Sequence, residues 1–311
     1  MEMPELPRER RSVPRTITPL SVPAVDAAGL LRFPLRQHVL EEVVRSALQE
    51  DCAFNDLTTI ATVISDRRSR ATLKVRQPGV VCGIPLALEA FRQLDPKVSI
   101  RVEHEDGARV QTGDPILFVT GHVRGLLSAE RVALNYMQRL SAIATCTARY
   151  VDAVTGTKAK ILDTRKTTPG LRTLEKYAVR AGGGTNHRLN LSTGVLIKDN
   201  HLAALDGDVA LAVRRARELA PAGTQIEVEC DSVPQVQQAV EARADVILLD
   251  NMPLNVLTEC VQLVAGRAIL EASGGVTLTT VRAIAETGVD WISVGALTHS
   301  APAMDLALDF E

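Results

Sequence analysis

Six short apolar runs between residues 161 and 295 share one pattern, because each ends in charged residues or glycines. They are ILDTRK (161–166), VLIKDNH (195–201), IEVE (226–229), VILLDN (246–251), ILEASGG (269–275) and WISVG (291–295). Segments long enough for helices separate most of these runs, and this spacing is typical of buried parallel strands in an α/β fold. The polar residues at the strand ends are therefore expected to meet on one rim of a parallel barrel, where such folds carry out chemistry.

The chain before the barrel has a different pattern. Short strand-like runs near 71–76, 98–102 and 116–119 surround a helical segment near 86–94, which predicts an α+β domain with an antiparallel sheet. A long helix is expected from about Ser128 to Val154. The predicted divisions are a mobile N-terminal extension (1–33), an α+β domain with the long connecting helix (34–156), the barrel (157–300) and a C-terminal helix that returns toward the first domain (301–311).

Composition excludes several classes of function. The net charge of −2 and the aromatic content of 3% argue against a nucleic-acid-binding protein. No apolar run approaches the roughly 18 residues that span a bilayer, so no membrane partner is expected. The five cysteines are scattered and form no CxxC pair, which predicts a reducing cytoplasmic location without disulfides or a zinc site.

The segment 160–201 is strongly basic, with eight Lys or Arg residues against three acids. Solvated helix faces explain some of these charges. They do not explain Arg165, Lys166 and Lys198, which come where strands end and suit phosphate or carboxylate binding. The run of glycines at 182–184 precedes His187 and Arg188, and we expect it to let the backbone approach a ligand and bring both side chains to the rim.

Two carboxylates, Glu229 and Asp250, end neighbouring predicted strands. Oxygen ligands without a cysteine or histidine partner suit Mg²⁺, which often binds one or two carboxylates together with substrate phosphates. Ion pairs with Lys166 and Lys198 are the alternative for either carboxylate alone. The glycines at 274–275 and Gly295 end the last two strands, where backbone N–H groups commonly hold a phosphate.

At these motifs the sequence resembles the quinolinate phosphoribosyltransferases. The matching runs are ERVALN (130–135), DTRKTTPGLR (163–172), GGGTNHR (182–188), IKDNH (197–201), EVE (227–229), LLDN (248–251), EASGG (271–275) and VGALTHS (294–300). The resemblance implies an open-faced sandwich domain on an incomplete α/β barrel, working as a homodimer. It also implies the reaction of quinolinate with phosphoribosyl pyrophosphate, with Mg²⁺, to nicotinate mononucleotide, pyrophosphate and CO₂. Asn55 and Cys230 depart from the family's usual residues and lie outside the charged cluster.

The resemblance, together with the chemistry of a dianionic acid and a sugar pyrophosphate, assigns the roles of the residues. Lys166, Lys198, Glu229 and Asp250 are the expected catalytic residues, and Glu229 and Asp250 bind the metal. Quinolinate is expected to contact Arg131, Thr164, Arg165, His187, Arg188 and Lys198, with Arg131 donated by the partner subunit. Phosphoribosyl pyrophosphate is expected to contact Lys166, Ala272, Ser273, Gly274, Gly275, Ser293, Val294 and Gly295.

Two alternatives remain open at this point. One is a phosphoribosyltransferase of the same fold that acts on another aromatic acid, such as nicotinate. The other is a non-catalytic protein that binds a phosphorylated metabolite. The intact set of Lys166, Lys198, Glu229 and Asp250 argues against the second, because binding alone does not require a metal pair beside a leaving-group lysine.

Overall fold

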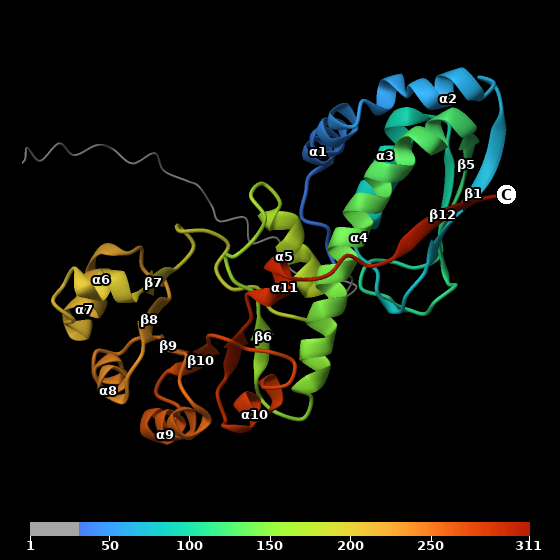
Figure 1. Ribbon diagram of the computed structural model, residues 1–311. Helices are drawn as coiled ribbons and strands as arrows, with labels where there is room; N and C mark the ends of the chain where they lie inside the picture. Colours follow the sequence, from blue (N-terminus) through green and yellow to red (C-terminus); the bar gives the residue numbers. More distant parts are fainter. Residues whose placement is uncertain (1–30) are drawn as a thin grey trace, which may run out of the picture.

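One long helix joins the two domains of the molecule. In the computed structural model, which describes residues 31–311, α4 spans Val123–Ala153 and passes from the first domain to the barrel (Figure 1). Its apolar residues recur at helical spacing, and its buried face includes Val132, Met137, Leu140 and Ile143. The helix begins five residues earlier than its sequence suggests, because β5 runs directly into it. α4 therefore contributes to both hydrophobic cores.

The first domain is an antiparallel sheet with helices on one face (Figure 1). The strand order is β12-β1-β5-β3, and Phe118 on β5 points away from the buried neighbours Leu117 and Val119. The guanidinium groups of Arg70 and Arg101 lie 4.3 and 4.5 Å from the Phe118 ring. The bounds are α1 Gln37–Glu50, η1 Ala53–Asn55, α2 Leu57–Thr62, β1 Arg68–Val75, β2 Gly79–Val80, α3 Ile84–Leu94, β3 Ser99–Val102, β4 Arg109–Val110, β5 Pro115–His122 and β12 Leu306–Phe310.

The predicted C-terminal helix over 301–311 is wrong. Residues 306–310 form the strand β12, which pairs antiparallel with β1 from Val75↔Leu306 to Ala71↔Phe310. Leu306 and Leu308 alternate with more exposed residues, which is the period of a strand rather than of a helix. The chain does return to the first domain, and it does so as the edge strand of that domain's sheet.

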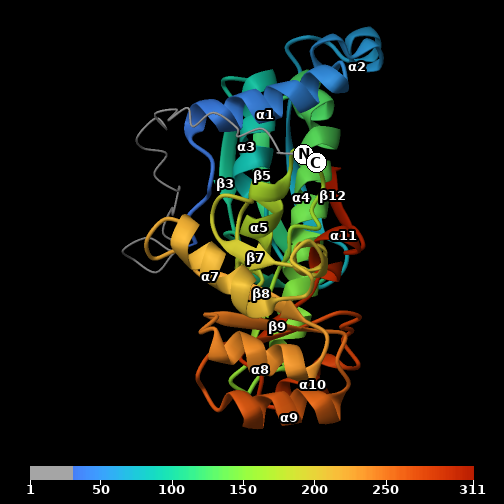
Figure 2. The ribbon, with the colours of Figure 1, turned by 90° about the vertical axis from the view of Figure 1, so that its left-hand side faces the viewer.

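The barrel contains the six parallel strands that the apolar runs predicted. The strand order is β6-β11-β10-β9-β8-β7, and β6 and β7 are the two ends of the sheet, so the barrel is incomplete. Figure 2 shows the helices of this domain arranged outside the strands. The bounds are β6 Lys160–Leu162, α5 Arg172–Ala181, β7 Val195–Ile197, α6 Asp199–Ala203, α7 Val209–Leu219, β8 Ile226–Cys230, α8 Val233–Glu241, β9 Val246–Asp250, α9 Leu254–Val264, β10 Ile269–Ser273, α10 Val281–Glu286, β11 Trp291–Ser293 and α11 Ala296–His299.

The predicted boundary of the N-terminal extension is wrong for residues 31–33. Leu31 and Phe33 pack against the hydrophobic core, and the Phe33 ring meets Tyr177 edge-on with 5.2 Å between centroids. Residues 1–30 of the predicted extension lie outside the described part of the chain. Among residues 31–311, no helix has the length and hydropathy that crossing a bilayer requires.

Candidate active site

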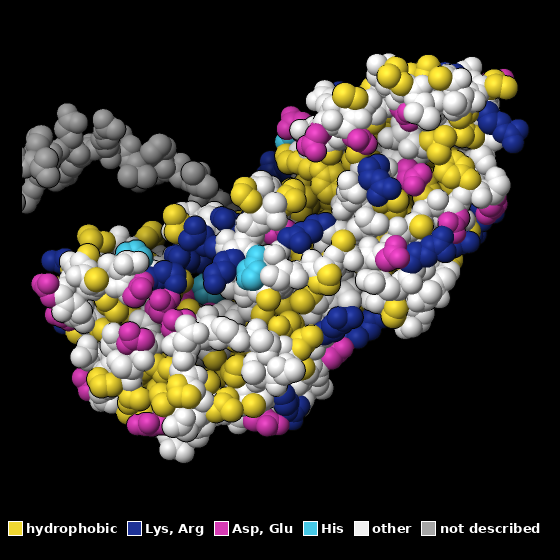
Figure 3. All heavy atoms as spheres, in the orientation of Figure 1, with side chains coloured by type: hydrophobic (Ala, Val, Ile, Leu, Met, Phe, Trp, Pro, Cys, Tyr) yellow, Lys and Arg dark blue, Asp and Glu magenta, His cyan; other side chains and the backbone are white. Residues whose placement is uncertain are grey.

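The carboxyl ends of the barrel strands surround a cavity of about 290 Å³. Figure 3 shows Lys and Arg side chains gathered beside histidine on the face of the barrel that turns toward the first domain. Seven predicted site residues line the cavity, together with Leu196 and Glu271; the seven are Thr164, Arg165, Lys166, His187, Arg188, Lys198 and Ser293. The structure therefore brings these seven predicted residues together at one cavity.

Lys166 is held by its backbone on both sides. Its N–H donates to the hydroxyl of Thr164 at 3.0 Å, and its carbonyl accepts from the hydroxyl of Thr298 at 2.7 Å. Arg139 on α4 donates to the backbone carbonyl of Thr298 and to the buried carboxylate of Glu175. The loop that follows β6 is thus fixed to the connecting helix, and the lysine side chain remains free to reach the cavity.

The buried carboxylate of Asp163 organises the other side of the cavity. It pairs with Lys176 on α5 at 2.5 Å and accepts hydrogen bonds from the Asn186 amide and from the His187 backbone N–H. Lys176 also donates to the His187 carbonyl at 3.0 Å. Burial raises the pKa of Asp163 and lowers that of Lys176, and their mutual attraction opposes both shifts. The result is a fixed backbone at His187.

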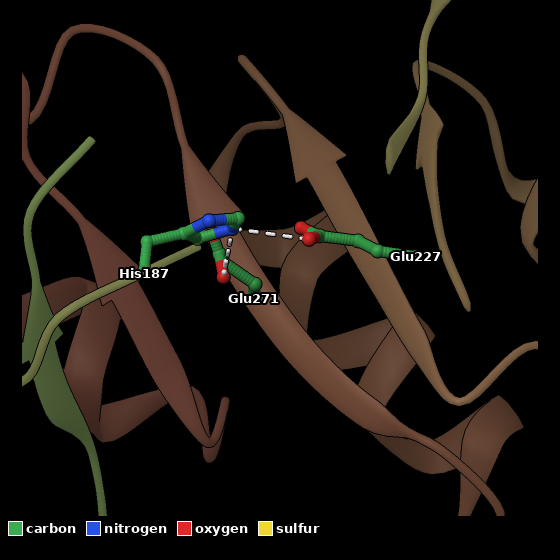
Figure 4. A group of neighbouring side chains, drawn as sticks. All are labelled: His187, Glu227 and Glu271. Carbon is green, nitrogen blue, oxygen red and sulfur yellow. Dashed lines mark ion pairs between the residues drawn. The ribbon is translucent and has the colours of Figure 1, made fainter. Parts of the chain in front are cut away.

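His187 lies between two buried glutamates (Figure 4). Its Nε2 is 3.0 Å from Glu227 Oε2 on β8 and 3.6 Å from Glu271 Oε2 on β10. Its Nδ1 accepts the backbone N–H of Arg188 at 2.8 Å. Both glutamates are buried, although they belong to strand runs that are otherwise apolar. The imidazole is therefore fixed on both nitrogens.

Arg188 and Arg165 place two guanidinium groups at the cavity. Arg188 donates to the Gly194 carbonyl at 3.0 Å, and burial together with the charge of Arg165 lowers its pKa. The buried Nε of Arg165 has no hydrogen-bond partner among the described residues. Crowded cations and an unused donor indicate a site for a multiply charged anion.

Lys198 and Glu229 form an ion pair across the ends of β7 and β8. The Lys198 backbone N–H donates to His201 at 2.9 Å, which fixes the start of α6. An ion pair with a lysine is the alternative to metal binding that the sequence analysis gave for Glu229 taken alone. Asp250 ends β9 opposite Ser273 on β10 and accepts a hydrogen bond from the Asn251 side chain at 2.9 Å.

The glycines of the 182–184 run approach α4 rather than the cavity, so that part of the prediction is wrong. A Cβ at Gly182 would lie 2.3 Å from the Ala144 carbonyl oxygen, and one at Gly184 would lie 2.7 Å from the Thr147 side chain. These glycines let α5 and its following loop pack against the connecting helix. Their effect on His187 and Arg188 is therefore indirect.

The predicted phosphate-binding residues end β10 and β11, beside the cavity. Gly274 has φ +95°, and a Cβ there would lie 2.1 Å from Asn251 Oδ1, so glycine is needed for the Asn251 side chain to reach Asp250. Within the described residues, the amides of Gly274 and Gly275 donate to no protein acceptor. The Val294 amide, by contrast, donates to the Leu162 carbonyl at 2.9 Å. Ala272 and Val294 are buried, while Gly295 lies at the start of α11.

Arg131 does not line the cavity of its own chain. It is exposed on α4, in the part of the helix that belongs to the first domain. Within a single chain, this predicted quinolinate-binding residue therefore lies apart from the other five, which line the cavity.

Comparison with known proteins decides the family. The chain matches the family "Quinolinate phosphoribosyl transferase, N-terminal domain" over residues 56–141 and the family "Quinolinate phosphoribosyl transferase, C-terminal domain" over residues 143–309. It belongs to the quinolinate phosphoribosyltransferase family.

Similar proteins within this family cover nearly the whole chain. The nicotinate-nucleotide pyrophosphorylase (carboxylating) of Mycobacterium leprae is 48% identical over 276 residues, which are 86% of this chain and 96% of that protein. The structure of the nicotinate-nucleotide pyrophosphorylase from Francisella tularensis is 38% identical with a TM-score of 0.84, covering 90% of this chain and 98% of that one. The NadC structure from Streptococcus pyogenes is 39% identical with a TM-score of 0.85, covering 89% and 99%.

The sequence analysis missed two residues that line the cavity, Leu196 and Glu271, and the buried Glu227 that pairs with His187. Leu196 was assigned only to a buried strand, and Glu227 and Glu271 were read as parts of the strand runs IEVE and ILEAS. An acid inside an apolar strand is costly unless it has a partner. Glu227 lies two residues before Glu229, and Glu271 lies two residues before Ser273. An acid at this position in an apolar strand is the sequence signal that could have identified both residues.

We predict that Asp163→Ala destabilises the protein strongly, because it leaves Lys176 buried without a partner. The expected loss is about 3–5 kcal/mol in the free energy of unfolding, measured by denaturant titration. Asp152→Ala is the control, since it breaks the exposed ion pair between Asp152 and Arg109 and should cost less than about 1 kcal/mol. Equal losses in the two variants would contradict the organising role of Asp163.

Proposed function

We propose that this protein transfers the phosphoribosyl group of phosphoribosyl pyrophosphate to the ring nitrogen of quinolinate. The products are nicotinate mononucleotide, pyrophosphate and CO₂, in the biosynthesis of NAD. The observation that carries the proposal is the cationic cavity at the strand ends, in a chain that belongs to the quinolinate phosphoribosyltransferase family.

The two carboxylates of quinolinate fit the cationic side of the cavity. Arg165 and Arg188 provide guanidinium groups suited to bidentate contacts, and the unused Arg165 Nε supplies a donor without breaking an existing bond. Thr164 and Lys198 line the same cavity, and the fixed imidazole of His187 forms part of its wall. A second carboxylate relieves the mutual repulsion of the two arginines, which favours quinolinate over nicotinate.

The sugar donor fits the residues that end the later strands. The 5′-phosphate is assigned to the loop of Ala272, Ser273, Gly274 and Gly275 and to Ser293, Val294 and Gly295, with the free amides of Gly274 and Gly275 as donors. The pyrophosphate is assigned to Lys166. Glu229 and Asp250 offer half-buried oxygen ligands at adjacent strand ends, a donor set that suits Mg²⁺ together with substrate phosphates.

Phosphoribosyl transfer depends mainly on stabilisation of the charge that develops on the leaving pyrophosphate, and it involves few proton transfers. Bound Mg²⁺ would neutralise the charge that develops on the leaving pyrophosphate. Lys166 adds a positive charge on the same side, and the arginines hold quinolinate with its ring nitrogen toward the sugar carbon. Lys198 links the two substrates, since it lines the cavity and pairs with Glu229. After transfer, the cationic ring withdraws electrons from the adjacent carboxylate, which leaves as CO₂.

The active unit is proposed to be a homodimer in which Arg131 enters the partner's cavity. An apolar surface beside α4, the helix that carries Arg131, supports this arrangement: Leu57, Ile60 and Ile64 on and after α2 are 46–74% exposed. The same segment is tied to α4, since Arg124 donates to the Val63 carbonyl at 2.9 Å. Large apolar side chains that gather on an exposed surface are typical of a subunit contact. The five unpaired cysteines agree with a cytoplasmic location.

The function is tested by pyrophosphate release from the sugar donor. Wild-type protein should release pyrophosphate only with quinolinate and Mg²⁺, and chelation of the metal should stop turnover. The double variant Glu229→Ala, Asp250→Ala should lose at least about 100-fold in kcat because it removes charge stabilisation of the leaving group. It should still bind quinolinate in calorimetry.

Glu259→Ala on α9 is the control for the double variant, because Glu259 is an exposed acid that does not line the cavity. Its turnover should match that of wild type. Near-normal turnover in the double variant would contradict the metal assignment, and no quinolinate-dependent release in wild type would contradict the function.

Mixed dimers test whether Arg131 acts in the partner's site. Arg131→Ala and Lys198→Ala should each be inactive alone. Random exchange makes half of the dimers mixed, and each mixed dimer has one intact site of two, so about a quarter of wild-type activity should return. If verified subunit exchange restores no activity, Arg131 does not act across the interface.

A further inference from the structure

Glu271 is a buried acid at the cavity for which the function above has no use. It sits on β10, lines the cavity, and its side chain is only 1% exposed. Neither of its carboxyl oxygens has a hydrogen-bond partner among the described residues. A buried carboxyl without donors is uncommon, because an ionised group in such a place loses its hydration without compensation.

The hydrogen bonds around His187 show which of its two glutamates carries a proton. Nδ1 accepts the Arg188 backbone N–H, so a proton on Nδ1 would face another proton. The ring therefore holds its proton on Nε2 and donates it to Glu227 at 3.0 Å. Glu227 is the ionised partner. Glu271, at 3.6 Å from the same nitrogen, receives no hydrogen bond and suits the neutral acid.

The charges that face Glu271 agree with this assignment. Burial raises the pKa of Glu271 to about 7, and the negative charge of Glu227 adds to the effect. The nearby His187 and Ser293 lower the pKa of Glu271, and the negative charge of Asp163 raises it. Burial lowers the pKa of His187, and its contacts with Glu227 and Glu271 outweigh burial and raise that pKa. The cationic side chains of the cavity, Arg165, Lys166, Arg188 and Lys198, are assigned to the negative charges of the two substrates.

Decarboxylation of quinolinate leaves an electron pair on ring carbon C2, and the product needs a proton there. Among the cavity residues, Lys166 is assigned to the leaving pyrophosphate. Lys198 is paired with Glu229, and His187 donates to Glu227. The arginines do not lose protons near neutral pH. Glu271 is the remaining acid with a proton and without a competing acceptor.

We propose that Glu271 is the general acid that protonates C2 after CO₂ leaves. This proposal rests on the function proposed above. The bond between C2 and its carboxylate breaks, CO₂ leaves, and the electron pair stays on C2. The O–H bond of Glu271 then breaks as the new C–H bond forms. The resulting carboxylate lies beside His187 Nε2–H, and solvent water returns the proton when the product leaves.

The test is Glu271→Gln, which keeps the size and neutrality of the side chain and removes the transferable proton. Quinolinate affinity should stay within about threefold, and a single turnover should release pyrophosphate at the wild-type rate. Formation of nicotinate mononucleotide should slow by about 10²- to 10⁴-fold, the range of general-acid catalysis. The wild-type rate of that step should fall as pH rises through about 7, since the neutral form of Glu271 is the active one. In the variant this fall should be absent.

Glu227→Gln is the matched comparison, because it alters the other glutamate of His187 and leaves the acid of Glu271 in place. It should keep the fall of the product-forming rate at high pH, even where it changes quinolinate affinity. Circular dichroism and denaturant titration establish that both variants are folded.

Three results would overturn the proposal: product formation in Glu271→Gln within threefold of wild type, persistence of the high-pH fall in that variant, or loss of quinolinate binding. The first two remove the proton-donor role, and the third makes Glu271 a binding residue. Absence of quinolinate-dependent pyrophosphate release in wild type is a different failure, which would overturn the proposed function and this inference with it.

Discussion

The buried carboxylate of Asp163 is the interaction on which the site depends. It joins three separate segments: the end of β6, Lys176 on α5, and the loop of Asn186 and His187. A buried ion pair contributes little net stability, but removing one partner is costly, so such a pair fixes a geometry. Here the fixed geometry sets the position of the His187 backbone, and through it the two glutamates and Arg188. The strand ends bring the residues near one another, and Asp163 sets their orientation.

The connecting helix α4 ties this organisation to the rest of the molecule. Glycines at 182 and 184 let the loop after α5 pack against it, and Arg139 on α4 holds Glu175 and the Thr298 carbonyl. Thr298 in turn holds the backbone of Lys166. The same helix carries Arg131, which is proposed to serve the partner's cavity. One rigid element would therefore position a lysine in its own site and an arginine in the neighbouring one.

Much of this arrangement could be predicted from sequence, for identifiable physical reasons. The barrel strands are short apolar runs with polar ends, and parallel strands place those ends on one rim, so Arg165, Lys166 and Lys198 were found at the cavity. The strand β12 was missed because its formation depends on the free edge of β1, which lies more than 200 residues away in the chain. Glu271 was missed because its proposed role depends on His187 and Glu227, which belong to other segments of the chain. The proposed position of Arg131 in the partner's cavity involves a second chain, which the sequence of one chain does not describe.

The most direct test of this account is the fate of the C2 carboxylate of quinolinate. With quinolinate labelled at that carboxylate, the protein should release one labelled CO₂ for each pyrophosphate, and only when phosphoribosyl pyrophosphate and Mg²⁺ are both present. Nicotinate, which lacks that carboxylate, should support little pyrophosphate release because it leaves the two arginines partly unneutralised. Efficient turnover of nicotinate, or pyrophosphate release from quinolinate without labelled CO₂, would contradict the assignment of this cavity to a dianionic acid.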